Sequence, residues 1–295
     1  QQLPGELDLL VPAFREGDSV GALGYLISTL DHVRARVSAS EWTDDVVRIC
    51  RDHELFDVVQ EDPYTARAYQ KPRGYAGDAV MLDYIYHGAP AGTTERGARL
   101  LRGTAEGPNG HSILWRRDLI AEELDRVARD LPGARVLAVA SGHLREAEVS
   151  RALRSGRIRE LVALDQDAES LARIERDCTA LPVTVCEGSV KHIIRGKLDL
   201  GGFDLVYAAG LYDYLTDRTA LALSRSLQQL LRPGGRLLIG NFTPRNHGRS
   251  YMEIFMDWHL ILRDEPHMAA HAQGLSGDAE IFSDPWGNVA YARVA

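Results

Sequence analysis

Apolar residues recur every three or four positions through roughly the first 130 residues of the chain, and this spacing predicts helices. Asp18 and Asp78 each stand directly before such a segment, as N-cap residues do, and Gly88 follows the second one. A longer helix should end at Pro132 and Gly133. No alternation typical of strands interrupts this region. The apolar positions of the expected helices are Val20, Leu23, Ile27, Leu30, Val33 and Val37; Trp42, Val46, Ile49, Cys50 and Leu55; Val80, Met81, Tyr84 and Ile85; and Ile113, Ile120, Leu124, Val127 and Leu131.

From Arg135 onward the pattern changes to short apolar runs separated by amphipathic stretches. Runs that are apolar throughout are typical of parallel strands buried on both faces, and their alternation with helices predicts βαβ units. Pro266 is expected to break the helical pattern before a terminal hairpin. The expected strands are Arg135 to Ala140, Leu161 to Asp165, Val183 to Cys186, Phe203 to Ala208 and Arg236 to Asn241, with Ala279 to Ser283 and Val289 to Val294 forming the hairpin.

Charge and composition narrow the class of protein. Acidic residues outnumber basic ones by 42 to 34, for a net charge of −8, so no positive field favours nucleic acid or an anionic membrane. No apolar run approaches the roughly 20 residues that span a bilayer, and we expect a soluble cytoplasmic protein. The three cysteines form no C-x-x-C pair. His267 and His271 have metal-ligand spacing but lack an evident third ligand, so we expect no metal site.

The first strand-to-helix turn is where a parallel sheet binds its ligand. It contains Gly142, which lets the backbone approach a ligand closely, and Asp165 ends the next expected strand. A carboxylate there can accept hydrogen bonds from both hydroxyls of a ribose, so the pair favours nucleoside binding. A tight turn beside a solvated acid remains the alternative interpretation.

Several segments in order resemble the class I S-adenosylmethionine-dependent methyltransferases. They are Val136-Leu-Ala-Val-Ala140-Ser-Gly-His-Leu144-Arg-Glu146, Cys186-Glu-Gly-Ser-Val190, Phe203-Asp-Leu-Val-Tyr-Ala-Ala-Gly-Leu-Tyr-Asp-Tyr-Leu215 and Leu231-Arg-Pro-Gly-Gly-Arg-Leu237. The resemblance implies an α/β fold: a Rossmann-like core with a mostly parallel seven-stranded sheet, an antiparallel C-terminal hairpin and a helical N-terminal lobe. It also implies S-adenosylmethionine as cofactor and S-adenosylhomocysteine as product. The cofactor-binding residues implied in the core are Ala140, Ser141, Gly142, His143, Asp165, Gln166, Gly188, Ser189, Val190, Ala208 and Gly210.

The chain departs from this family at the first turn. The family has an acid followed by Gly-x-Gly-x-Gly, whereas this chain has Ala138, Ala140 and Leu144 at three of those positions and keeps only Gly142. Ser189 stands where an aspartate often contacts the adenine. A turn without three glycines is not shaped for a pyrophosphate, which disfavours a nicotinamide or flavin cofactor and makes an oxidoreductase a remote alternative.

A narrower resemblance spans nearly the whole chain. Lys71-Pro-Arg-Gly-Tyr-Ala-Gly-Asp-Ala-Val-Met-Leu-Asp-Tyr-Ile-Tyr86, Ala208-Ala-Gly-Leu-Tyr-Asp-Tyr-Leu215 and Met256-Asp-Trp-His-Leu260 are similar to a bacterial methyltransferase subgroup described as acting in 3-hydroxypalmitic acid methyl ester biosynthesis. This implies methylation of the carboxylate of a small or fatty acid. We expect residues 1–131 to form a helical lid that covers the substrate pocket, and residues 132–295 to form the cofactor-binding catalytic domain.

The candidate catalytic residues are Tyr212, Asp213 and His259, with packing as the alternative role of the tyrosine and the histidine. Arg73 and Tyr75 are expected in a lid over the cofactor, where Arg73 or Lys71 could pair with the methionine carboxylate; the alternative is a plain connection between helices. The candidate substrate-binding residues are Tyr214, Asn241, Asp78, Met81 and Arg116. For Asp78 helix capping is the alternative, for Asn241 a turn, and for Arg116 a solvated ion pair.

Methyl transfer from a sulfonium is an in-line displacement that depends mainly on alignment in a pocket with little water. A carboxylate acceptor is already ionised at neutral pH and needs no base. We therefore expect carboxyl O-methylation of a small, partly apolar acid, with a homodimer as the candidate assembly. O- or N-methylation of a hydroxyl or amine by means of a general base is the alternative. A non-catalytic regulator that binds S-adenosylmethionine is a further one.

Overall fold

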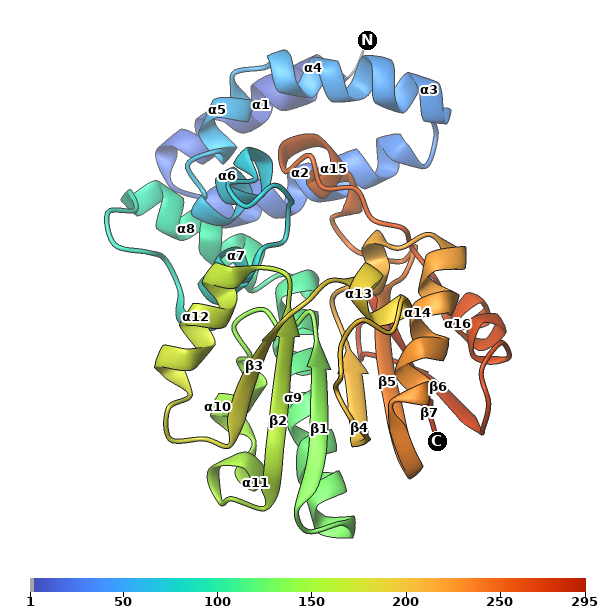
Figure 1. Cartoon of the computed structure of the whole chain (residues 1–295). Coiled ribbons are helices and arrows are strands. Elements are labelled where there is room, and N and C mark those ends of the chain that lie inside the picture. Colours follow the sequence, from blue (N-terminus) through green and yellow to red (C-terminus); the bar gives the residue numbers. More distant parts are fainter. Residues whose placement is uncertain (1–2) are drawn as a thin grey trace. The chain divides into compact units, whose positions relative to one another are not determined.

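Seven strands form one sheet in the order β3-β2-β1-β4-β5-β7-β6 in the computed structural model, which describes residues 3–295 (Figure 1). Strands β1 to β5 pair in parallel, and β7 runs antiparallel to both of its neighbours, β5 and β6. This confirms the predicted fold class, a mostly parallel sheet with an antiparallel C-terminal hairpin. The strands are β1 (Ala134–Val139), β2 (Ile158–Asp165), β3 (Val183–Glu187), β4 (Phe203–Ala208), β5 (Leu231–Phe242), β6 (Ala279–Ser283) and β7 (Val289–Val294).

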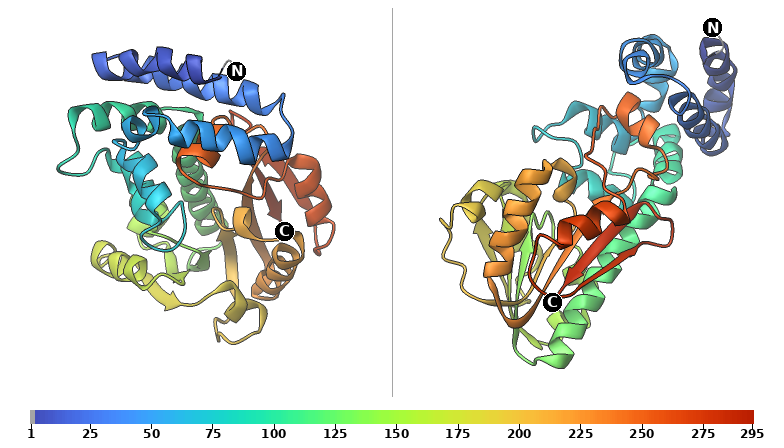
Figure 2. Two further views of the ribbon diagram at one scale, coloured as in Figure 1. Left: turned by 90° about the horizontal axis from the view of Figure 1, so that it is seen from above. Right: turned by 90° about the vertical axis from the view of Figure 1, so that its right-hand side faces the viewer.

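Helices cover both faces of this sheet. Val136 and Ala138 of β1 belong to one buried apolar cluster, while Leu137 and Val139 belong to another. Helix α9 packs into the first cluster and α14 into the second, and they lie on opposite sides of the sheet (Figure 2). This two-sided burial explains why the strands are apolar throughout. The helices that accompany the sheet are α9 (Pro108–Asp130), α10 (Glu146–Val149), α11 (Arg151–Arg154), α12 (Ala168–Asp177), α13 (Val190–Ile194), α14 (Asp217–Gln229) and α16 (Glu265–Ala272), with the short η2 (Tyr212–Tyr214).

The described N-terminal residues are helical, as predicted. Asp18 accepts a hydrogen bond from the Gly21 amide and caps the second helix, and Asp78 caps the seventh by accepting one from Met81. The second helix buries Leu23 and Leu30 as expected, but Val20 is 46% exposed, and Ala22 and Leu26 are buried as well. These helices are α1 (Leu3–Glu16), α2 (Ser19–Arg34), α3 (Ala39–Glu41), η1 (Trp42–Val46), α4 (Val47–Asp52), α5 (Leu55–Val59), α6 (Pro63–Gln70), α7 (Ala79–His87), α8 (Glu95–Ala105) and, from beyond β5, α15 (Arg249–Phe255).

The described chain divides into two compact units. Unit 1 extends to Ile113 and regains Asn246–His259, and unit 2 comprises Leu114–Arg245 and Leu260–Ala295. The boundary therefore lies inside α9 and not at the expected residue 131, because α9 packs its apolar side into the core of the sheet from Leu119 onward. The segment Asn246–His259 belongs to unit 1 because the side chains of Trp42 and Arg51 donate hydrogen bonds to it.

Three local expectations were wrong. Strand β5 begins at Leu231, since Pro233, Gly234 and Gly235 form an irregularity within the strand and not a turn before it. Pro266 lies in the first turn of α16, where its missing amide hydrogen costs nothing, so it starts a helix there. Val149 and Leu153 suggest one helix after β1, but the structure divides it at Ser150, whose hydroxyl caps α11.

Among residues 3–295, no helix combines the length and the apolar composition needed to cross a membrane.

Candidate functional site

The turn after β1 has an alternating backbone. Ala140, Gly142 and Leu144 all have φ near +54°, in the left-handed region. Two of these residues carry a Cβ, and each such residue pays about 1–2 kcal/mol to adopt that conformation. Ala140 and Leu144 stand where the resembled family has glycine, and both keep a left-handed backbone in this chain although they are not glycines. Backbone strain of this kind is concentrated at ligand-binding sites.

Asp165 ties this turn to the end of β2. Its carboxylate accepts hydrogen bonds from the Gly142 amide at 2.8 Å and from the Asp167 amide at 3.0 Å, one on each oxygen. Burial raises the pKa of Asp165 against the lowering effect of these hydrogen bonds. A carboxylate has about four acceptor positions, so that of Asp165 keeps the capacity to accept a further hydrogen bond beside those from Gly142, Asp167 and the Gln166 backbone. Asp165 can therefore shape the turn and still bind a diol.

Ser141 supplies an unused polar group in the same turn. Its Oγ is buried and makes no hydrogen bond with any described residue. A buried hydroxyl without a partner costs free energy, so such atoms usually mark a bound water or ligand. The methionine part of S-adenosylmethionine carries both donors and acceptors. The turn thus fits this cofactor, with His143 buried beside the serine.

The loop after β3 approaches the same edge of the sheet. The Gly188 amide donates to the Asp165 carbonyl at 2.9 Å, which places the two expected cofactor segments side by side. A Cβ at Gly188 would lie 2.9 Å from the Leu198 side chain, so only glycine fits without a shift. Ser189 and Val190 are partly exposed and lead into α13, and Gln166 is exposed.

Arg116 lies over the end of β4. Its Nη1 donates to the Ala209 carbonyl at 2.9 Å, and a Cβ added to Gly210 would lie 3.4 Å from the same nitrogen. Gly210 is exposed, whereas Ala208 is buried within the strand. Helix α9 thus delivers a cation to the carboxyl end of β4, the edge at which parallel sheets bind their ligands.

Asp213 is buried just beyond β4. The Phe242 amide donates to its Oδ1 at 2.6 Å. Burial raises the pKa of Asp213 to about 6, although this hydrogen bond and the charges of Arg116 and Arg263 favour its ionised form. A carboxyl group with a pKa near neutrality is suited to general-base chemistry.

Two other predicted residues of this edge serve the fold. The Tyr212 hydroxyl shares a hydrogen bond with Ser224 at 2.6 Å, and the tyrosine is fully buried. Asn241 is also fully buried: its amide donates to two backbone carbonyls, and its oxygen accepts from Arg263 at 2.7 Å. The roles of Tyr212 as a catalytic residue and of Asn241 as a substrate contact stay predictions. Tyr214 differs from them, since it is 40% exposed.

His259 lies in unit 1, beside Asp257. It is exposed, and its Nε2 is 3.3 Å from Oδ1 of Asp257. Burial alone would raise the pKa of Asp257, but hydrogen bonds from Lys71 and Arg51 outweigh this effect and lower it to about 2. Lys71 and Asp257 both have positive φ. This candidate catalytic histidine is therefore accompanied by a carboxylate that is ionised at neutral pH.

The segment Lys71 to Met81 contains the predicted lid residues. Arg73 and Tyr75 are partly exposed. Asp78, in contrast, is almost wholly buried, and it caps α7 while accepting from Nε of Arg67 at 2.8 and 2.9 Å. Met81 is fully buried. The capping role that we held as the alternative for Asp78 is thus present in the structure.

Sequence reasoning missed Glu146 and Tyr207. The Tyr207 hydroxyl donates to Oε1 of Glu146 at 2.5 Å, and both side chains are buried. Burial raises the pKa of Glu146, while the bond from Tyr207 and the charges of Arg116 and Arg145 oppose this shift. In the sequence, the one signal for this pair was the acidic residue Glu146 at the start of the helix that follows the turn after β1.

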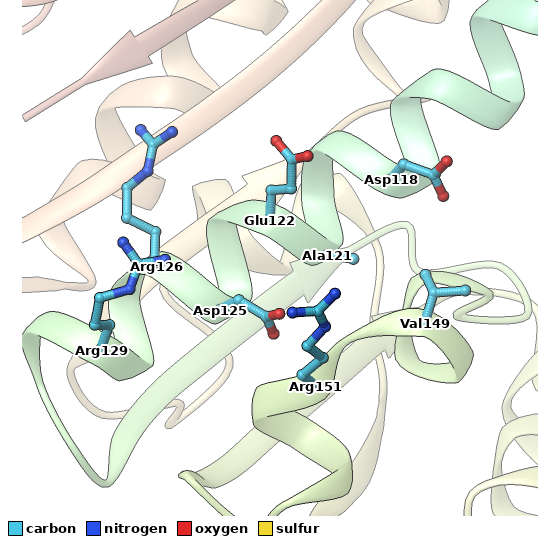
Figure 3. Close-up of a pocket in the computed structure, with 8 residues that line it drawn as sticks. All are labelled: Asp118, Ala121, Glu122, Asp125, Arg126, Arg129, Val149 and Arg151. Carbon is cyan, nitrogen blue, oxygen red and sulfur yellow. The ribbon is translucent and has the colours of Figure 1, made fainter.

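A surface pocket of about 530 Å³ lies elsewhere, between α9 and the helices α10 and α11 (Figure 3). Asp125, which lines this pocket, accepts hydrogen bonds from the Ser150 hydroxyl at 2.9 Å and from the Ala152 amide at 2.8 Å. No candidate site residue lines it, and its side chains are mostly charged. Within the described part of the chain, no group of three or more His, Cys, Asp or Glu side chains is arranged to hold a metal ion.

No protein-family model and no curated protein matches the sequence. Among solved structures, the chain is similar to a "possible exported protein" from Bordetella parapertussis, with a TM-score of 0.63 and 19% identity over 88% of this chain and 97% of that one. The magnesium protoporphyrin IX methyltransferase of Synechocystis, with bound S-adenosylmethionine, has a TM-score of 0.47 and 11% identity over 74% and 97%. The N-methyltransferase NodS of Bradyrhizobium japonicum, in complex with S-adenosylhomocysteine, has a TM-score of 0.45 and 14% identity over 60% and 85%.

The sheet with its hairpin forms a mostly parallel α/β fold, and the described N-terminal region is helical. The left-handed first turn, Asp165 and the carboxyl end of β4 form one candidate cofactor site within unit 2.

Proposed function

We propose that this protein is an S-adenosylmethionine-dependent methyltransferase that acts on a small molecule. The observation that carries the proposal is the turn at Ala140 to Leu144, which keeps a left-handed backbone without the usual glycines and is tied to Asp165. A strained backbone at a nucleoside-binding edge is retained where it has a use. The buried Ser141 hydroxyl without a partner supports the same site.

The residues divide between the parts of the cofactor. Asp165 would accept hydrogen bonds from the ribose hydroxyls, and Gly188 to Val190 would border the adenine. Ser141 and Arg116 are placed for the methionine part, Arg116 by a charge-assisted pair with its carboxylate. S-adenosylmethionine, when bound, supplies an activated methyl group. The chain's own task is to orient it and to exclude water.

We further propose carboxyl O-methylation of a small, partly apolar acid as the reaction. An acceptor carboxylate is ionised at neutral pH, so the protein needs to align it and not to deprotonate it. The resemblance of the segments Lys71 to Tyr86 and Met256 to Leu260 to the fatty acid methyl ester subgroup supports this choice.

A screen of carboxylic acids of increasing chain length, with methyl esters detected by mass spectrometry, tests this reaction. Ester formation that requires S-adenosylmethionine and is lost in Asp165→Ala supports the proposal. Methylation confined to alcohols or amines contradicts it.

Methylation of a hydroxyl or amine is the second candidate. One observation favours it: the pKa of Asp213 is raised to about 6 by burial, which suits a general base near neutral pH. Its carboxylate could take the proton of such an acceptor.

A further inference from the structure

Arg263 is a cation in the interior of unit 2, where it is only 4% exposed. A guanidinium has five N–H donors, and here each of the five makes a hydrogen bond. Nη1 donates to the Tyr212 carbonyl at 3.0 Å and to Oδ1 of Asn241 at 2.7 Å. Nη2 donates to the Leu215 carbonyl at 2.7 Å, and Nε and Nη2 both donate to Oδ1 of Asp217, at 2.9 and 2.7 Å. A buried cation is stable only when its donors are met in this way.

These bonds hold the short turn η2, Tyr212–Tyr214, from both ends. The carbonyls of Tyr212 and Leu215 flank the turn, and both accept from the one guanidinium. The turn is closed within itself by bonds from the Tyr214 amide to the Leu211 carbonyl at 3.1 Å and from the Leu215 amide to the Tyr212 carbonyl at 3.0 Å. Opening the turn would leave donors of a buried cation unpaired, which is costly, so Arg263 fixes its conformation.

Asp213 lies in the middle of this turn, and the same network bonds it on two sides. The Ile261 amide donates to the Asp213 carbonyl at 2.8 Å, and the Phe242 amide donates to its Oδ1 at 2.6 Å. The Arg263 amide donates in turn to the Phe242 carbonyl at 2.9 Å. Asn241 joins the two flanking segments, since its amide group donates to the carbonyls of Phe242 and Ile261, each at 2.9 Å. The place of the Asp213 carboxyl group therefore depends on the residues that Arg263 binds.

The turn follows β4 at its carboxyl end, the edge at which parallel sheets bind their ligands. Tyr214 is 40% exposed there. We propose that Arg263 is a positioning residue for methyl transfer: by holding both ends of the turn, it places the Asp213 carboxyl group and the Tyr214 ring for the acceptor. This inference rests on the proposed function, because it takes a methyl acceptor bound at this edge. Groups that are fixed before the ligand arrives lower the cost of binding and of orientation.

Arg263→Lys tests this role, because lysine keeps the charge but has only three donors and no planar fork. With the best acceptor from the screen, kcat should fall about tenfold or more, since a small misplacement of aligned groups is costly to the rate. Calorimetry should show that the affinity for S-adenosylhomocysteine changes less than about twofold, a difference of less than half a kcal/mol. None of the residues proposed to bind the cofactor is hydrogen-bonded to the Arg263 guanidinium.

Carbon-13 NMR of the Asp213 carboxyl group gives a second readout that needs no acceptor, with Asp213→Asn assigning the signal. Burial raises the pKa of Asp213 to about 6, against the hydrogen bond from Phe242 and the charges of Arg116 and Arg263. Arg263→Lys retains a positive charge, so a change in this pKa reports a change in burial. We expect the pKa to fall toward that of an ordinary aspartate, about 4, as the turn loosens and water reaches the carboxyl group.

Arg232→Lys is the matched control. Arg232 donates at 2.8 Å to Asp204, a buried carboxylate at the opposite end of β4, so this variant should leave kcat and the pKa of Asp213 unchanged. If Arg263→Lys does not fold, Asp217→Ala replaces it. That variant keeps the guanidinium and removes the exposed partner of two of its bonds, and the expected loss of kcat is then about threefold.

An unchanged pKa of Asp213 in Arg263→Lys overturns the inference, and this measurement decides alone if the screen finds no acceptor. An unchanged kcat also overturns it, as does the same loss in Arg232→Lys. A loss of cofactor affinity as large as the loss of kcat means a merely structural role and counts against the inference equally. A folded wild-type protein that binds no S-adenosylhomocysteine overturns the proposed function itself, which separates the two failures.

Discussion

At the scale of single residues, buried carboxyl groups depart furthest from their ordinary chemistry. Asp62 is fully buried in unit 1 and accepts hydrogen bonds from the Tyr64 amide at 3.0 Å and from the hydroxyls of Thr65 and Thr104 at 2.7 and 3.1 Å. Burial nevertheless raises its pKa to about 6, well above that of an ordinary aspartate. Because the folded pKa exceeds the unfolded one, Asp62 contributes stability below about pH 4, and this contribution is lost as the pH rises to about 6.

Asp62→Asn is expected to remove this pH dependence. The wild type should lose about 2 kcal/mol more unfolding free energy than the variant between pH 4 and pH 7, since each unit of pKa shift corresponds to about 1.4 kcal/mol and the unfolded chain is already partly ionised at pH 4. Urea denaturation at several pH values measures the difference. Parallel curves for the two proteins would show that Asp62 does not titrate with a raised pKa.

Asp213→Asn separates the two candidate reactions. If Asp213 is a general base, kcat/KM of the wild type should rise with pH through about 6, and the variant should lose this limb together with about 10²-fold or more of the rate. If the acceptor is a carboxylate, the limb should be absent from the start. A pH–rate profile of the best acceptor distinguishes these outcomes, with Asp204→Asn as the control for loss of a buried carboxylate.

At the scale of elements, the sequence predicted strand bounds and helix caps correctly where one local feature, such as an apolar run or a capping aspartate, determines them. Strand β4 and both hairpin strands have the expected bounds, and Asp18 and Asp78 cap helices as expected. The exposure of Val20 in α2 and the start of β5 were not predicted, because they depend on which neighbours pack against them. The position of Pro266 also could not be predicted, since a proline can either end a helix or occupy its first turn, as it does in α16.

The candidate site follows the same division. Gly142 and Asp165 could be predicted from spacing, and they are joined by a hydrogen bond of 2.8 Å. Glu146 and Tyr207 could not, because their contact joins residues 61 positions apart. Asn241 was predicted as a ligand contact, but a strand-end amide can equally bind the backbone around it, and the sequence contains no information on which it does.

The left-handed turn makes a prediction about strain. Ala140 has φ of +54° and an exposed side chain, so Ala140→Gly removes the Cβ conflict without opening a cavity. The relief of about 1–2 kcal/mol exceeds the backbone entropy cost of glycine, about 0.5–1 kcal/mol. Denaturant unfolding should therefore show a gain of roughly 0.5 kcal/mol. Ala138→Gly, in the regular strand before the turn, should destabilise; a loss of stability at both positions would refute the strain at Ala140.

At the scale of the whole molecule, the chain is organised as two units with an interrupted connectivity. Residues after β5 return to unit 1, where Trp42 donates to Glu253 at 2.8 Å and Arg51 donates to the Ile254 carbonyl at 2.8 Å. This return was not visible in the sequence, because nothing in Asn246–His259 shows which helices it packs against. The candidate cofactor residues of the turn, β2 and the end of β4 all belong to unit 2, and we propose that the nucleoside binds there.

Calorimetric titration with S-adenosylmethionine, with S-adenosylhomocysteine and with NAD as the control ligand tests the central claim most directly. We predict micromolar binding of both sulfur nucleosides and none of NAD. Asp165→Asn should weaken both nucleosides about tenfold or more, because it removes the charge that accepts the ribose hydroxyls. A folded wild-type protein that binds neither sulfur nucleoside, or that binds NAD as well as it binds them, would contradict the account.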